Sequence, residues 1–149
     1  MMLKVKLKVN PENYEYFKNE IEKLGISIDD GAELTLLEEN LSQSISVRKE
    51  DDIYIIPVES IIYIESFGHN IVIHREDGQY NKRDTLANLQ NILRNENFIR
   101  INNSTIVNKE KIKHIRPIIG MKFDLLLVNG SKTLVTRSYY YQFKEAIGF

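Results

Sequence analysis

Short apolar runs separated by turn residues recur along residues 51–136, and this pattern predicts a mainly β fold with short helices. Asn129-Gly130 is the strongest hairpin signal in the chain, and Asp77-Gly78 is another. A short helix is predicted over residues 86–93, and a last one, capped by Ser138, near the C-terminus. The predicted strands cover residues 53–56, 61–65, 71–74, 79–83, 98–101, 106–107, 112–119, 121–128 and 133–136.

The first 47 residues follow a different pattern. Lysines alternate with apolar residues over positions 3–9, which predicts a half-buried strand. Asn10 and Pro11 predict the start of a helix that Asn10 caps, and Gly25 predicts its end. Two short strands, over residues 26–28 and 33–37, come next, and the polar stretch 38–46 is interpreted as a linker. The sequence therefore predicts two parts: a small βαββ piece over residues 1–47 and a β domain over residues 48–149.

The βαββ piece has too few residues for a secure independent core. It must pack either on the rest of the chain or on a second copy. The alternating strand over residues 3–9 could pair with its twin. We therefore expect the N-terminal piece to support a homodimer, or otherwise to act as a regulatory element.

Composition narrows the class of protein. The chain has no Cys, so it can form neither disulfides nor thiolate metal sites. No apolar run approaches the ~20 residues that a membrane span needs. Because the N-terminus alternates lysines with apolar residues, it also lacks the apolar block of a signal peptide. We expect a cytoplasmic protein.

The net charge of −1 hides an asymmetry along the chain. Residues 1–47 carry five Lys and Arg against nine Asp and Glu. Residues 98–149 carry nine against three, a net charge of +6. A basic C-terminal third is what a phosphate-facing surface needs, although an uneven surface charge can also be incidental.

Catalytic motifs are not apparent in the sequence. His69, His74 and His114 lack metal-ligand spacing, and His74 lies in an alternating strand as a structural residue would. The pairs Asp29-Asp30 and Asp51-Asp52 fall at turns or strand edges. There is no nucleophile elbow, phosphate-binding loop or dinucleotide fingerprint. We expect neither an enzyme nor a bound cofactor, metal or small-molecule substrate.

One stretch, residues 98–108, joins two apolar strands through the polar elbow Asn102-Asn103-Ser104-Thr105. Asn can bond an adenine edge bidentately, while Ser, Thr and Arg bond phosphates. The elbow can therefore be a nucleic-acid reading surface. It can equally be a surface turn whose Asn residues tolerate unusual dihedral angles.

A series of motifs in residues 48–149 resembles the LytTR-type DNA-binding domain. They are Ile61-Ile62-Tyr63-Ile64-Glu65-Ser66, Thr85-Leu86-x-x-Leu89, the run from Phe98 to Asn108, Ile112-x-x-Ile115, Asn129-Gly130 and Val135-Thr136-Arg137-Ser138. The resemblance implies an elongated arrangement of small antiparallel sheets. It also implies a transcriptional regulator whose loops, rather than a recognition helix, enter successive major grooves of double-stranded DNA with repeated half-sites.

The resemblance also implies site residues on three loops. Base contacts fall on His69, Asn103 and Arg137, whose chemistry suits an acceptor edge, adenine and guanine. Arg137 would begin a helix, a poor position for a cation unless an anion faces it. Phosphate contacts are expected from Asn70, Arg100, Ser104, Ser138 and Tyr140. Arg100 could instead pair with an acid such as Glu65.

The sequence departs from the commoner family pattern in two places. Many relatives have His where this chain has Asn102, so we expect an altered base preference or only a phosphate contact there. Most such domains follow a receiver domain of roughly 120 residues, whereas only about 47 precede this one, so we expect a stand-alone regulator. Relatives of that build are often restrained by a membrane-protein inhibitor. The alternative function is a protein-interaction or ligand-sensing module on the same scaffold, without DNA binding.

Overall fold

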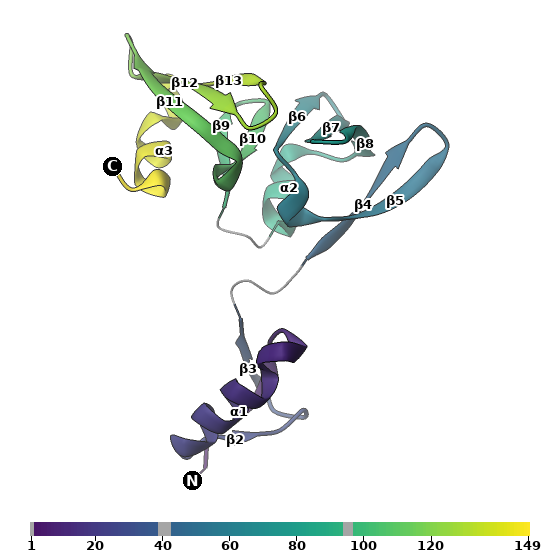
Figure 1. Ribbon diagram of the computed structural model, residues 1–149, viewed down its shortest axis with the longest axis vertical. Coiled ribbons are helices and arrows are strands. Elements are labelled where there is room, and N and C mark those ends of the chain that lie inside the picture. The colour runs from purple at the N-terminus through teal and green to yellow at the C-terminus, as the bar shows by residue number, and fades with distance from the viewer. Residues whose placement is uncertain (1, 39–42, 94–96) are drawn as a thin grey trace. The chain divides into compact units, whose positions relative to one another are not determined.

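The computed structural model describes residues 2–38, 43–93 and 97–149, and the chain divides into two compact units, residues 1–42 and 43–149 (Figure 1). The fold is mainly β with short helices, as the sequence predicts. None of the helices in these described ranges is long and apolar enough to cross a membrane.

The N-terminal unit is a three-stranded parallel sheet with one helix. It consists of β1 (Lys4–Lys8), the 3-10 helix η1 (Pro11–Asn13), α1 (Tyr14–Lys23), β2 (Ser27–Ile28) and β3 (Leu34–Leu37). Val5 and Leu7 of β1 are buried, as the alternating pattern predicts. The expected cap on Asn10 is wrong: its side chain makes no capping bond. Instead the Glu38 carboxylate accepts from the Asn10 backbone N–H (2.7 Å) and from Asn13 Nδ2 (3.0 Å).

Strand β1 lies at the centre of this sheet, in the order β2-β1-β3. Val5 pairs with Ile28 on one side and with Leu34 on the other. Both edges of β1 therefore have partner strands within one copy of the chain: β2 along Lys4 and Val5, and β3 from Val5 to Lys8. The expectation that this strand pairs with its twin is wrong, because the parallel crossover through α1 brings β2 to one edge and β3 takes the other.

The second unit contains a seven-stranded antiparallel sheet in the order β5-β4-β8-β7-β6-β10-β9. Strand β4 begins inside the predicted linker, because Ile45 and Val47 alternate with exposed serines and Arg48 and are buried. The other strands and the helix α2 lie where the sequence predicts them, except that β6 starts and ends two residues later than predicted. The strands are β4 (Ser44–Lys49), β5 (Asp52–Pro57), β6 (Tyr63–Phe67), β7 (Asn70–Arg75), β8 (Gly78–Arg83), β9 (Phe98–Asn102) and β10 (Thr105–Asn108), with η2 (Val58–Ser60) before β6 and α2 (Leu86–Ile92) after β8.

A second, three-stranded antiparallel sheet completes this unit together with the C-terminal helix (Figure 1). It comprises β11 (Ile112–Ile118), β12 (Lys122–Leu127) and β13 (Lys132–Val135), preceded by η3 (Lys109–Lys111) and followed by η4 (Arg137–Tyr139) and α3 (Tyr140–Ile147). Gly120 and Gly130 take positive φ, +94° and +86°, at the two hairpin turns, which explains why glycine stands there. The predicted cap on Ser138 is wrong, because α3 starts two residues later with no side-chain cap.

Two hydrophobic cores lie on opposite faces of the large sheet. In the first, α2 packs on residues such as Ile64 and Ile106. In the second, α3 and β12 pack on Tyr63 and Val107. Neighbouring residues of β6 and of β10 thus face different cores, which explains why these strands read as continuous apolar runs instead of alternating.

Candidate nucleic-acid interface

Three polar segments meet at one end of the large sheet: the β6–β7 turn, the elbow between β9 and β10, and the segment 136–139 that follows β13. The Ser66 backbone N–H donates to the Ser104 carbonyl oxygen at 2.8 Å, which joins the first two segments. The Thr136 backbone N–H donates to the Ile101 carbonyl oxygen at 3.0 Å, which joins the third. The structure therefore brings together the loops that carry His69, Asn103 and Arg137.

Asn102 organises the elbow from within. Its Oδ1 accepts from the Ser104 backbone N–H (2.9 Å) and from Ser104 Oγ (3.1 Å). Its Nδ2 donates to the Leu134 carbonyl oxygen at 2.9 Å, which ties the elbow to β13. An Asx-type turn of this kind fixes the backbone without a regular ladder. Asn102 is thus engaged inside the protein, while Asn103 and Ser104 are exposed at the tip.

Asn103 is held by two neighbours. Arg100 donates from Nη2 to the Asn103 carbonyl oxygen (2.8 Å) and from Nε to the Asn102 carbonyl oxygen (3.3 Å). The Tyr139 hydroxyl donates to Asn103 Oδ1 at 3.3 Å, and the Arg100 guanidinium lies 5.9 Å from the Tyr139 ring centre. The alternative pairing of Arg100 with Glu65 does not occur, because Glu65 Oε1 lies 2.7 Å from Nε2 of His74.

His69 stands at the tip of the β6–β7 turn. Gly68 takes φ +68° there, a conformation that favours glycine, and allows the chain to reverse in two residues. The Asp84 backbone N–H donates to the His69 carbonyl oxygen at 3.0 Å, so the turn is fixed to the end of β8. The His69 side chain is exposed beside a surface hollow of about 460 Å³ that Phe67, Asn70 and Arg83 also line.

Arg137 and Ser138 are exposed in the first turn after β13. Among the residues that the structure describes, Arg137 has no ion pair, so its guanidinium is available to a ligand. Tyr139 and Tyr140 are both partly buried against the second core, and the Tyr140 ring stacks on Phe123 with centroids 4.9 Å apart and planes at 3°. Of the two tyrosines, Tyr139 is the one whose hydroxyl bonds the elbow.

Tyr139 is a site residue that the sequence prediction missed. Tyr139 and Tyr140 are adjacent, and both are partly buried against the second core, so sequence alone does not tell which hydroxyl reaches Asn103. His74 behaves as predicted: it is 7% exposed and stacks on Tyr63 at 3.9 Å, away from the turn tips. Within the described ranges, no group of three or more His, Asp or Glu side chains could hold a metal ion.

Comparisons with known proteins agree on one family. Residues 51–148 match the family model of the LytTr DNA-binding domain. The chain is 33% identical over 107 residues to the sensory transduction protein LytT of Enterococcus faecalis, covering 72% of this chain. It is 31% identical over 109 residues to the transcriptional regulatory protein LytR of Staphylococcus aureus, covering 73% of this chain. Each match spans 44% of the relative's length.

One solved structure gives the same result. The LytTr DNA-binding domain of a response regulator from Bacillus cereus superposes with a TM-score of 0.67 at 26% sequence identity. The superposition covers 71% of this chain and 97% of that domain. The antiparallel sheets and short helices described above are therefore the architecture of that domain.

Proposed function

Because the chain belongs to the LytTr DNA-binding domain family, we propose that it is a transcriptional regulator that binds double-stranded DNA sequence-specifically in the cytoplasm. The observation that carries the proposal is the meeting of three exposed polar loops at one end of a sheet, joined by backbone hydrogen bonds of 2.8 and 3.0 Å. Such an edge can present side chains to base edges from several points at once. The basic C-terminal third supports an anionic partner.

Each loop then has a distinct task in successive major grooves. The Arg137 guanidinium forks onto O6 and N7 of guanine, Asn103 bonds an adenine edge, and His69 donates to an acceptor edge. Because Arg100 already donates to two elbow carbonyls, its main role in this scheme is to position Asn103.

The remaining exposed polar side chains contact phosphates of the DNA backbone. Asn70, Ser104 and Ser138 flank the base-reading residues and are exposed. Hydrogen bonds to phosphates set register and orientation without reading sequence. Tyr140 can bond a phosphate only if its hydroxyl reaches solvent while its ring stays stacked on Phe123. We therefore propose Asn70, Ser104 and Ser138 as the main phosphate contacts and Tyr140 as a secondary one.

We also propose that the chain binds repeated half-sites as a homodimer, with β3 as the contact. The outer edge of β3 has no partner strand in the described sheet, and Leu34, Leu36 and Leu37 are 55%, 41% and 51% exposed. An apolar edge strand is a template for pairing with another chain, and a two-fold axis would pair β3 with its own copy. Restraint by a membrane-protein inhibitor stays a prediction of the resemblance.

The dimer is tested by light scattering after gel filtration. We expect the wild type to have twice the chain mass of 17.4 kDa at micromolar concentration. Leu36→Lys should be a monomer, because a charge on the edge blocks pairing. Leu24→Lys is the matched control, since Leu24 is 77% exposed but lies outside the sheet. A monomeric wild type, or equal behaviour of the two variants, would contradict β3 pairing.

DNA reading is tested by selecting bound duplexes from a random pool, with Arg137→Ala and Asn103→Ala run beside the wild type. The wild type should enrich a repeated motif, and each variant should lose about 1–3 kcal/mol on the selected site with an unchanged circular dichroism spectrum. If folded wild type enriches no motif at low salt, the interaction or ligand-sensing module becomes the better description.

A further inference from the structure

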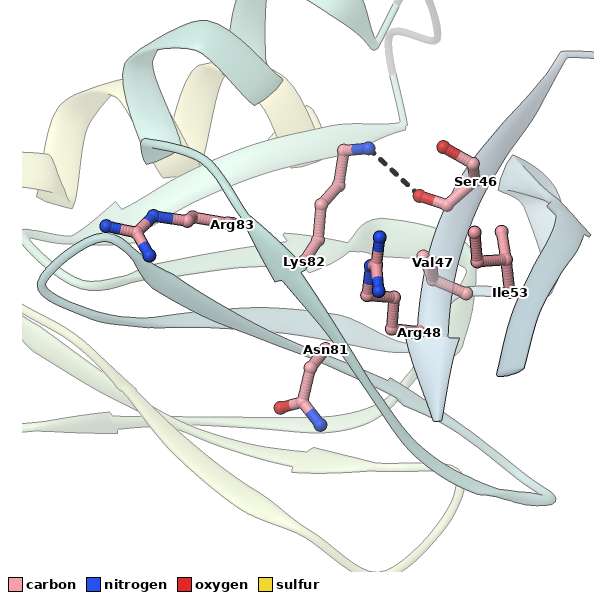
Figure 2. Close-up of a pocket in the computed structure, with 7 residues that line it drawn as sticks. All are labelled: Ser46, Val47, Arg48, Ile53, Asn81, Lys82 and Arg83. Atoms are coloured by element: carbon pink, nitrogen blue, oxygen red, sulfur yellow. Dashed lines mark hydrogen bonds between the residues drawn. The ribbon is translucent and has the colours of Figure 1, made fainter. Parts of the chain in front are cut away.

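Three cations lie beyond the His69 turn, on the two strands next to it in the sheet. Lys82 and Arg83 end β8, and Arg48 lies on β4, paired in register with Asn81. We call Arg48, Lys82 and Arg83 the β8–β4 strip. In Figure 2, Lys82 reaches towards Ser46 of β4 with Arg48 close by, while Arg83 points away from both.

Arg83 connects the strip to the proposed DNA interface. It pairs in register with Asn70 at the start of β7 and lines the hollow of about 460 Å³ that contains His69. It also lines a second hollow, of about 210 Å³, together with Arg48 and Lys82. The two hollows therefore share one arginine, which lies on the strand between the His69 turn and β4.

The cations of the strip are not paired with acids. Within the described ranges, none of the three cations forms an ion pair with a carboxylate. Lys82 Nζ donates to the Ser46 carbonyl oxygen at 2.9 Å, which still leaves two of its N–H groups. Asp84, the acid next in sequence, is committed elsewhere: its Oδ1 accepts from the Thr85 backbone N–H and from Asn88 Nδ2, both at 2.8 Å.

We propose that the β8–β4 strip binds phosphates of the DNA backbone and so extends the duplex contact past the segment that His69 reads. This inference rests on the proposed function. Adjacent strands are about 4.8 Å apart, and each DNA strand carries a phosphate every ~3.4 Å of rise, so cations on β8 and β4 can meet neighbouring phosphates. The strip contributes affinity and salt dependence but no sequence preference.

The test compares two double variants of the full chain, each with two fewer positive charges. Arg48→Ala with Arg83→Ala removes the two exposed cations of the strip and leaves Lys82 bonded to Ser46. Lys113→Ala with Lys132→Ala removes two exposed cations from β11 and β13, at the end of that sheet away from Arg137. Binding to one selected duplex is titrated from low to high salt, and duplex selection is repeated for both variants.

We expect the strip variant to lower the slope of log affinity against log salt by about two, one for each lost phosphate contact, while selecting the wild-type motif. The control variant should keep the wild-type slope. A strip variant with the wild-type slope, or an equal loss in both variants, would overturn the inference while leaving the proposed function intact. A wild type that selects no motif would overturn both.

Discussion

Replacing Asn102 by Ala should destabilise the DNA-binding unit, because this side chain makes three hydrogen bonds inside the protein. Two are accepted from Ser104, at 2.9 and 3.1 Å, and one is donated to the Leu134 carbonyl oxygen at 2.9 Å. Each is worth about 0.5–1.5 kcal/mol net. Since Ser104 is exposed and can recover water, we expect the free energy of unfolding to fall by about 1.5–3 kcal/mol. The measurement is urea denaturation.

Asn103→Ala is the matched variant one position away. Its side chain is exposed and accepts one long hydrogen bond, 3.3 Å, from Tyr139, so the unfolding free energy should change by less than about 0.5 kcal/mol. Asn103→Ala should instead weaken DNA binding, whereas Asn102→Ala should lower both the stability and the DNA affinity. If Asn102→Ala unfolds at the wild-type urea concentration, or if the two variants are equally destabilised, the division of roles within the elbow is wrong.

Three further outcomes can be measured on the same unit. Leu89→Ala should lower the free energy of unfolding by about 2–5 kcal/mol, because Leu89 is 0% exposed between α2 and the sheet; urea denaturation checks this. Tyr139→Phe removes the hydroxyl that bonds Asn103 and should weaken DNA binding several-fold at nearly unchanged stability, as a titration with the selected duplex would show. Burial raises the pKa of Tyr63 above its ordinary value of 10.0, outweighing the opposing hydrogen bond with Ser131. The unfolding free energy should therefore fall as the pH rises past about 10, and fall less steeply in Tyr63→Phe.

Local signals explain what the sequence predicted correctly. The hairpins at Asp77-Gly78 and Asn129-Gly130 form where expected, because the glycines supply positive φ, +133° and +86°. The sequence prediction missed the start of strand β4, because the serines and the arginine at its exposed positions resemble a linker. The strand order β2-β1-β3 could not be predicted either, because alternation reveals a half-buried strand but not which strands pair with its edges.

For the candidate site, too, the sequence predicted some features, and others became visible only in the structure. The resemblance to the LytTR-type domain identified His69, Asn103 and Arg137 and gave them their roles, which the chemistry of each side chain suits. The contacts that hold these residues needed coordinates: Arg100 donates to carbonyl oxygens of the elbow, and Tyr139 rather than Tyr140 bonds Asn103. Every residue has a backbone carbonyl, so residue types do not show which carbonyl accepts a hydrogen bond from a given side chain.

The placement of the elbow explains how such a surface can change its DNA preference without losing the fold. Next to it, Ile106 and Val107 of β10 face opposite cores, and Ile101 of β9 is fully buried, so both ends of the elbow are fixed by packing. Asn103 and Ser104 at the tip are exposed and contribute little to that packing. A substitution at the tip therefore changes the groups offered to DNA, whereas one at Asn102 or Arg100 changes the geometry that presents them. Under the proposed function, altered operator preference should arise by substitution at His69, Asn103 and Arg137, with stability preserved.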